Sequence, residues 1–162
     1  MLSGAKFLSN EALKDTFNEH TNLATVDLSE CHSVTAVCLQ PLAVQCKTLK
    51  RLILKDCHWV TRASMEYFAH HQNSLITINL TGCWELVDQT IVQLLASFRQ
   101  LQFVSVANIY SLTDQTMKAI AAYTPNLIAL DIRGCWRITD QGVARVAEYC
   151  PNLRLLNITD CR

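Results

Sequence analysis

Residues 127–143 read LIALDIRGCWRITDQGV, a stretch in which apolar and polar residues alternate before a polar turn follows. The same arrangement recurs at a constant interval of 26 residues, and each copy opens on a leucine: Leu23, Leu49, Leu75, Leu101, Leu127 and Leu153. A fixed period between about 20 and 50 residues is typical of a solenoid, in which each unit packs only on its neighbours. The chain is therefore predicted to consist of stacked repeats.

Each unit is predicted to contain a strand, a turn and a helix. In the copy that starts at Leu49, the apolar residues Leu52 and Leu54 occupy alternate positions, as in a strand with one buried face. A cysteine and then a pair such as Thr113-Asp114 follow in most copies, and these side chains suit the first turn of a helix. The rest of the unit has apolar residues at helical spacing, as in Ile91, Leu94, Leu95 and Phe98, and in Val143, Val146, Ala147 and Cys150.

This unit has the pattern of the cysteine-containing leucine-rich repeat. Strands that are joined through helices pair in parallel, so we expect an α/β solenoid with the strands on its concave face and the helices on its convex face. One domain is predicted over 1–162, with a partial repeat at 1–22, five full repeats at 23–152 and a truncated repeat at 153–162.

Charge and hydropathy argue against nucleic-acid and membrane roles. The 14 basic and 14 acidic residues cancel, so no net field favours nucleic acid or anionic lipid. The first residues, 1–11, have no apolar run of the length of a signal peptide, and no stretch approaches the roughly 20 apolar residues of a membrane helix. We therefore expect a location in the cytoplasm or the nucleus.

The cysteines are predicted to be packing residues. Five of the eight share one repeat position, namely Cys31, Cys57, Cys83, Cys135 and Cys161. Their spacing follows the repeat rather than a disulfide framework, which favours buried thiols in a reducing compartment.

A metal site is the remote alternative, because Cys31-His32 and Cys57-His58 offer two thiols and two imidazoles to a zinc ion. Neighbouring residues of an extended segment point in opposite directions, which argues against convergence of these four groups. His70-His71 is interpreted as a pair near the C-terminus of a helix, where the helix dipole favours partial positive charge. No phosphate loop, nucleophile elbow or pair of carboxylates is found, so neither catalysis nor a cofactor is expected.

Two exposed rows are candidates for a protein-binding surface. Residues between the buried strand positions form a concave row of Asp27, Ile53, Asn79, Ser105, Asp131 and Asn157. The position after the cysteine forms an aromatic row of His32, His58, Trp84, Tyr110 and Trp136, which either stack on one another or form a binding rim. The candidate protein-binding residues are Arg51, Ile53, Lys55, Asn79, Trp84, Phe103, Ser105, Tyr110, Asp131, Arg133 and Trp136.

Residues 127–143, together with TGCW at 81–84 and CPNL at 150–153, resemble the cysteine-containing repeats of F-box/LRR proteins. The chain is most similar to the F-box/LRR-repeat protein 15 (jetlag-like) subgroup, through Trp59-Val60 and a repeat with Ile109 in place of the cysteine. The resemblance implies a non-catalytic substrate receptor of a Skp-cullin-F-box ubiquitin ligase, which promotes ubiquitination and proteasomal degradation of a bound protein.

In that family a separate F-box of roughly fifty residues binds the Skp adaptor and, through it, the cullin. The sequence has no such segment ahead of its repeats, so we expect a fragment of a longer protein that binds substrate but does not recruit the adaptor. The alternative is a cysteine-rich LRR protein without an F-box that regulates by binding alone, similar to the antagonist-of-mitotic-exit proteins.

Overall fold

The computed structural model describes residues 8–161, in which six parallel strands form one open sheet in chain order. The strands are β1 (Thr25–Asp27), β2 (Arg51–Ile53), β3 (Thr77–Asn79), β4 (Phe103–Ser105), β5 (Ala129–Asp131) and β6 (Leu155–Asn157). The helices are α1 (Asn10–Glu19), η1 (Ala36–Cys38), α2 (Leu39–Gln45), α3 (Arg62–His71), α4 (Asp88–Ser97), α5 (Asp114–Tyr123) and α6 (Asp140–Tyr149).

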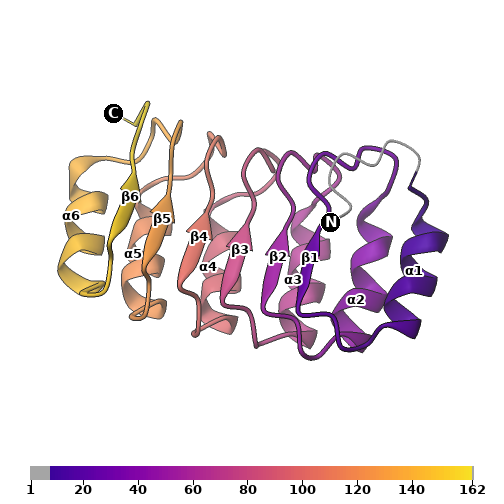
Figure 1. Ribbon diagram of the computed structural model, residues 1–162. Coiled ribbons are helices and arrows are strands. Elements are labelled where there is room, and N and C mark those ends of the chain that lie inside the picture. Colours follow the sequence, from indigo (N-terminus) through magenta and orange to yellow (C-terminus); the bar gives the residue numbers. More distant parts are fainter. Residues whose placement is uncertain (1–7, 162) are drawn as a thin grey trace.

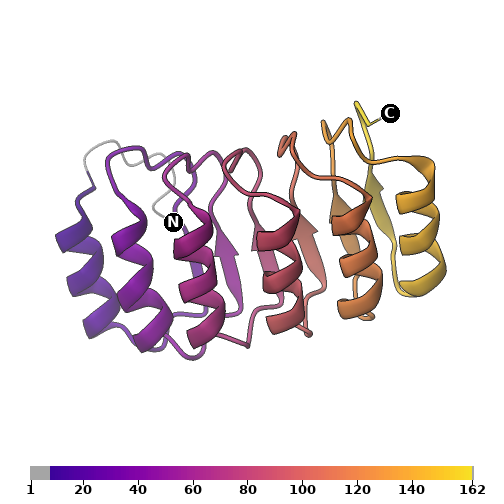
Figure 2. The same cartoon turned by 180° about the vertical axis from the view of Figure 1, so that it is seen from behind.

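The helices stand side by side on one face of the sheet and leave the other face open (Figure 1). Figure 2, seen from behind, shows the same helices in front of the strands. The predicted α/β leucine-rich-repeat solenoid is confirmed.

Strand pairing keeps the 26-residue interval without a shift. Val26 pairs with Leu52, Leu52 with Ile78, and the same relation continues to β6. The middle residue of each strand from β1 to β5 is buried against the helices, whereas its two neighbours face the open side. Each apolar position therefore packs on the same position of the next unit, and a single core runs along the solenoid.

The chain turns after each strand through a residue with positive φ. These residues are Glu30, Asp56, Gly82, Asn108, Gly134 and Asp160. Their N–H groups continue the pairing between repeats, since Asp56 donates to the carbonyl oxygen of Thr81 at 2.7 Å and Gly82 to that of Ala107 at 2.9 Å. The side chain of Asp56 occupies the space that a Cβ at position 82 would need, and the positive φ there also favours glycine.

Where a cysteine follows the turn, its thiol ties that repeat to the one before it. The thiol of Cys57 donates to the carbonyl oxygen of Leu28 at 3.0 Å, and that of Cys83 to Leu54 at 3.2 Å. Cys135 makes the equivalent bond. Burial raises the pKa of the Cys57 and Cys83 thiols from 9.0 to about 12, so these thiols are protonated donors at neutral pH.

Helix starts are linked between repeats by aspartates. Asp88 accepts from the backbone N–H of Thr113 at 3.0 Å and from its hydroxyl at 2.7 Å, and Asp114 does the same for Thr139. Thr113 was expected to cap its helix and does so, because its hydroxyl oxygen accepts from the N–H of Gln115. Thr139 also donates its hydroxyl to Asp114, but within the described chain its side chain accepts no cap hydrogen bond.

Two details differ from the sequence-based expectations. Ala147, expected on the inward stripe of its helix, is exposed, and Val143 is only half-buried, because α6 packs chiefly against α5 among the described helices. The second repeat has a short 3-10 helix followed by the seven-residue α2, whereas α3 spans ten residues. Pro41 lies in the first turn of α2, where its missing N–H is tolerated.

Thr90 and Thr116 occupy the same repeat position, yet their replacement by valine is expected to have opposite effects. Thr116 donates to Asp88 at 2.7 Å, whereas the buried hydroxyl of Thr90 has no partner among residues 8–161, because Arg62 occupies the position equivalent to Asp88. Thr116→Val should lower the free energy of unfolding by about 1–3 kcal/mol, and Thr90→Val should raise it by about 1 kcal/mol. Urea unfolding of both variants measures these changes, and equal losses would contradict the assignment.

The buried thiols predict a loss of stability at high pH. Below about pH 9 the thiols of Cys57 and Cys83 are protonated in both states; above it the unfolded chain releases these protons while the folded chain retains them up to a pKa of about 12. The free energy of unfolding should therefore fall by up to about 1.4 kcal/mol per pH unit and thiol across that window. Urea unfolding under reducing conditions at several pH values should give a shallower fall for Cys83→Ala. An unchanged slope would show that this thiol is not protected by burial.

Candidate functional site

The open face of the sheet holds a shallow depression over its four C-terminal strands. The depression has a volume of about 380 Å³ and lies across β3 to β6. It is lined by the residues of these four strands, namely Thr77, Ile78, Asn79, Phe103, Val104, Ser105, Ala129, Leu130, Asp131, Leu155, Leu156 and Asn157. Its large exposed apolar side chains are Phe103, Leu155 and Leu156, at 36%, 64% and 39% exposure.

Four of the candidate residues predicted from the sequence meet in this depression, namely Asn79, Phe103, Ser105 and Asp131. Arg51 and Ile53 lie on β2, beside the depression and on the same face. The depression also contains Thr77, Ala129 and Leu155, which were not predicted. Register alone could have found them, because they occupy the same strand position as Phe103.

Part of the concave row has a structural role that the sequence did not reveal. The side-chain oxygen of Asn79 accepts from the N–H of Thr81 at 2.9 Å, and that of Asp131 accepts from the N–H of Arg133 at 3.1 Å. Ser105 connects these two, with its hydroxyl 2.7 Å from that of Thr81 and donating to Asp131 at 3.5 Å. These polar side chains hold the ends of their strands, so they frame the depression in fixed positions.

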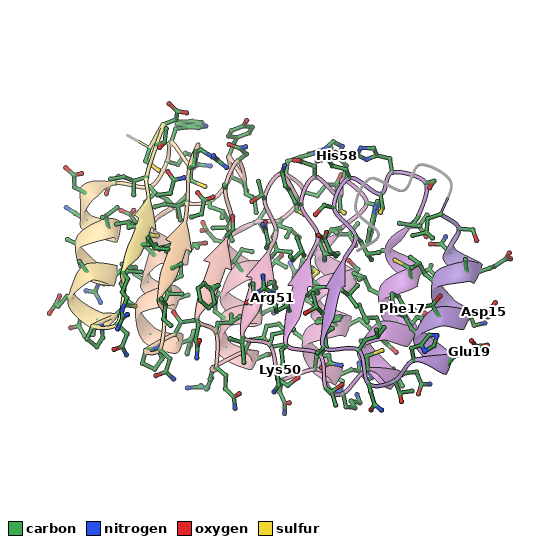
Figure 3. All side chains as sticks on the ribbon, in the orientation of Figure 1. Asp15, Phe17, Glu19, Lys50, Arg51 and His58 are labelled. Carbon is green, nitrogen blue, oxygen red and sulfur yellow. The ribbon has the colours of Figure 1, made fainter. Side chains whose placement is uncertain are left out.

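The basic residues of the concave face differ in their pairing. Lys55 lies 3.6 Å from Glu30 and 3.7 Å from Asp56, and Arg133 lies 3.6 Å from Asp131. The exposed side chain of Arg51, by contrast, has no hydrogen bond or ion pair within residues 8–161. Figure 3 shows it projecting from the face that the helices leave open. Arg51 is thus a cation of this face that is available to a partner.

The predicted aromatic row lies along the turns at one edge of the sheet, where His58 is seen in Figure 3. The rings of His32 and His58 are 5.8 Å apart, and those of His58 and Trp84 are 6.1 Å apart. Toward the C-terminal end the contacts stop, and within the described chain no ring contact joins Trp84, Tyr110 and Trp136. These three side chains are each 54% exposed. The rings of the row therefore contact one another in tilted arrangements at its N-terminal half and stand apart at its C-terminal half.

Trp59 is a further aromatic residue of these turns and has a structural position. It is half-buried against the core, and its indole N–H donates to the carbonyl oxygen of Cys31 at 2.6 Å. Ser111 occupies the same repeat position as Trp59 and donates to the carbonyl oxygen of Leu86 at 2.7 Å. Both residues, each directly after a residue of the aromatic row, thus connect neighbouring turns.

The four groups considered as zinc ligands point in different directions. Cys31 and Cys57 are fully buried, whereas His32 and His58 are exposed. Among residues 8–161, no group of three or more His, Cys, Asp or Glu side chains is arranged to hold a metal ion. No helix in this range is both long and apolar enough to cross a membrane.

Comparison with known proteins agrees with this geometry. A family model described as leucine rich repeat matches residues 124–147. A search of curated proteins gave no significant match.

Two solved structures share the fold. One chain from the crystal structure of the Rad7 and Elc1 complex in yeast is 21% identical with a TM-score of 0.82, over 93% of this chain and 39% of that one. The tropomodulin C-terminal domain of Caenorhabditis elegans is 16% identical with a TM-score of 0.68, over 88% of this chain and 92% of that one. The chain thus spans well under half the length of the yeast chain that it matches. With its repeat match and its sheet of parallel strands, it is a leucine-rich-repeat solenoid.

Proposed function

We propose that the chain binds a protein partner on its concave face and serves as the substrate-recognition part of a Skp-cullin-F-box ubiquitin ligase. The observation that carries the proposal is the depression over β3 to β6, where Phe103 and Leu155 are exposed within a frame of fixed polar side chains. Exposed apolar and aromatic side chains grouped on one face of a soluble protein are typical of a protein-binding site. The bound protein would then be ubiquitinated and degraded.

Two further observations support this assignment. The cysteine-containing repeats resemble those of F-box/LRR proteins, most of all the F-box/LRR-repeat protein 15 subgroup, and the fold is shared with a chain from the Rad7 and Elc1 complex. In this role the chain binds the substrate, and a separate F-box binds the adaptor. The free, buried cysteines favour a reducing compartment, and we place the protein in the cytoplasm or the nucleus.

Removal of the apolar side chains of the depression should weaken partner capture. The test variant combines Phe103→Ala with Leu155→Ala, and the matched control combines Val44→Ala with Tyr149→Ala, which are exposed on the helices. Each pair removes two exposed apolar side chains, so stability should change little in either. Affinity capture from cell extract, quantified by mass spectrometry, should show at least about a tenfold loss of specific partners for the first pair only. Equal capture by both variants would refute a concave binding site.

The aromatic rim gives a separate prediction. Replacing Trp84 and Trp136 with alanine should weaken capture more than it lowers the melting temperature, because both rings are largely exposed and only Trp84 contacts a neighbouring ring, that of His58. Thermal unfolding and capture are measured on the same preparation. Unchanged capture would restrict the binding surface to the concave face and leave the rim a packing role.

A further inference from the structure

The first residue of each strand forms a row across the open face in which small and large side chains alternate. From β1 to β6 the row reads Thr25, Arg51, Thr77, Phe103, Ala129 and Leu155. The three large residues are exposed, whereas Thr77 and Ala129 are half-buried between them. The row is therefore a series of ridges and hollows whose period is two strands.

The two hollows inside the row differ in chemistry. The hollow at Thr77 lies between Arg51, whose guanidinium has no partner in the described chain, and the ring of Phe103. The hollow at Ala129 lies between Phe103 and Leu155 and is apolar on both sides. The first hollow thus suits an anionic side chain that reaches Arg51, and the second suits an aliphatic side chain.

The spacing of the hollows selects the conformation of the segment that fills them. Strands lie about 4.8 Å apart, so hollows two strands apart are separated by about 9.6 Å. A polyproline II segment repeats its face every three residues, or about 9.3 Å. An extended strand repeats its face at about 6.7 and 13.4 Å, and two turns of an α-helix cover about 10.8 Å. The polyproline II conformation fits best, and it is the form in which proline-rich segments dock on aromatic-lined grooves.

We propose that the concave face takes a polyproline II segment of its protein partner that runs across the strands, with an Asp or Glu in the hollow at Thr77 and a Leu-like residue three positions away in the hollow at Ala129. This inference rests on the proposed function and specifies the chemistry of the partner. The carboxylate pairs with the guanidinium of Arg51, which is planar and donates two parallel hydrogen bonds to one carboxylate. A single available guanidinium matches the single charge of a carboxylate better than the double charge of a phosphate.

The peptide test varies only the spacing. Fluorescein-labelled proline peptides carry Glu-Pro-Pro-Leu or the reverse order, Leu-Pro-Pro-Glu, and the control peptides have one or three prolines between the same two residues. In fluorescence polarisation with the whole chain, one of the two peptides with two prolines should bind about tenfold tighter than the control peptides with one or three prolines. Equal binding of all spacings, or no binding of any peptide up to millimolar concentration, would overturn the proposal.

Variants of the chain assign the two hollows. Arg51→Glu should weaken binding of the glutamate peptide about tenfold, and a peptide with lysine in place of glutamate should bind this variant again. Lys118→Glu makes the same charge change at an exposed position of α5 and should have no effect. Ala129→Phe should fill the apolar hollow and abolish binding, whereas Ala144→Phe, at an exposed position of α6 away from the sheet face, should not. Loss of binding in both charge variants, or in both phenylalanine variants, would contradict the placement.

A phosphoserine peptide of the same spacing completes the test. Binding tighter than that of the glutamate peptide would overturn the choice of a carboxylate. The outcome is separable from the proposed function. If no peptide binds while the Phe103 and Leu155 double variant still loses its partners, the polyproline II register is wrong and the concave site stands. If partner capture is unaffected, the concave site itself is wrong.

Discussion

The whole structure depends on parallel pairing of strands at a constant interval of 26 residues. Because no insertion shifts the register, every position of a unit meets the same position of the next. The backbone must then turn at one point in every repeat, and the residues there take positive φ, which Gly82 and Asn108 adopt readily and Glu30 adopts against its preference. The thiol of Cys57 fits because it is small, apolar and still able to donate to the preceding turn.

The same register creates the surface on which function depends. Positions that point away from the helices are free of core packing, so their side chains can vary along the sheet while their spacing stays fixed. Phe103 and Leu155 stand two strands apart for this reason, and the small Ala129 between them leaves a hollow. In a solenoid, residues that recur once per repeat in the sequence therefore lie on one surface at the constant spacing of the strands.

The sequence predicted the parts of the structure that follow from periodicity. The alternation around Leu52 located the strand face, and the shared position of Cys57 predicted its burial. The depression was harder to foresee, because it depends on the combination of Phe103 and Leu155 with a small residue between them. The side-chain bond of Asn79 was also missed, since the pattern shows that a position is exposed but not what it binds. The short α2 reflects Pro41, a departure from the repeat that periodicity cannot describe.

The central claim is that the partner binds in the hollows of the open sheet face. The most direct measurement is a crystal structure of the chain bound to a protein recovered by affinity capture. Partner side chains should lie within about 4 Å of Phe103 and Ala129, and the bound segment should cross β3 to β6. A partner that lies only on the helices, with the sheet face empty, would contradict it.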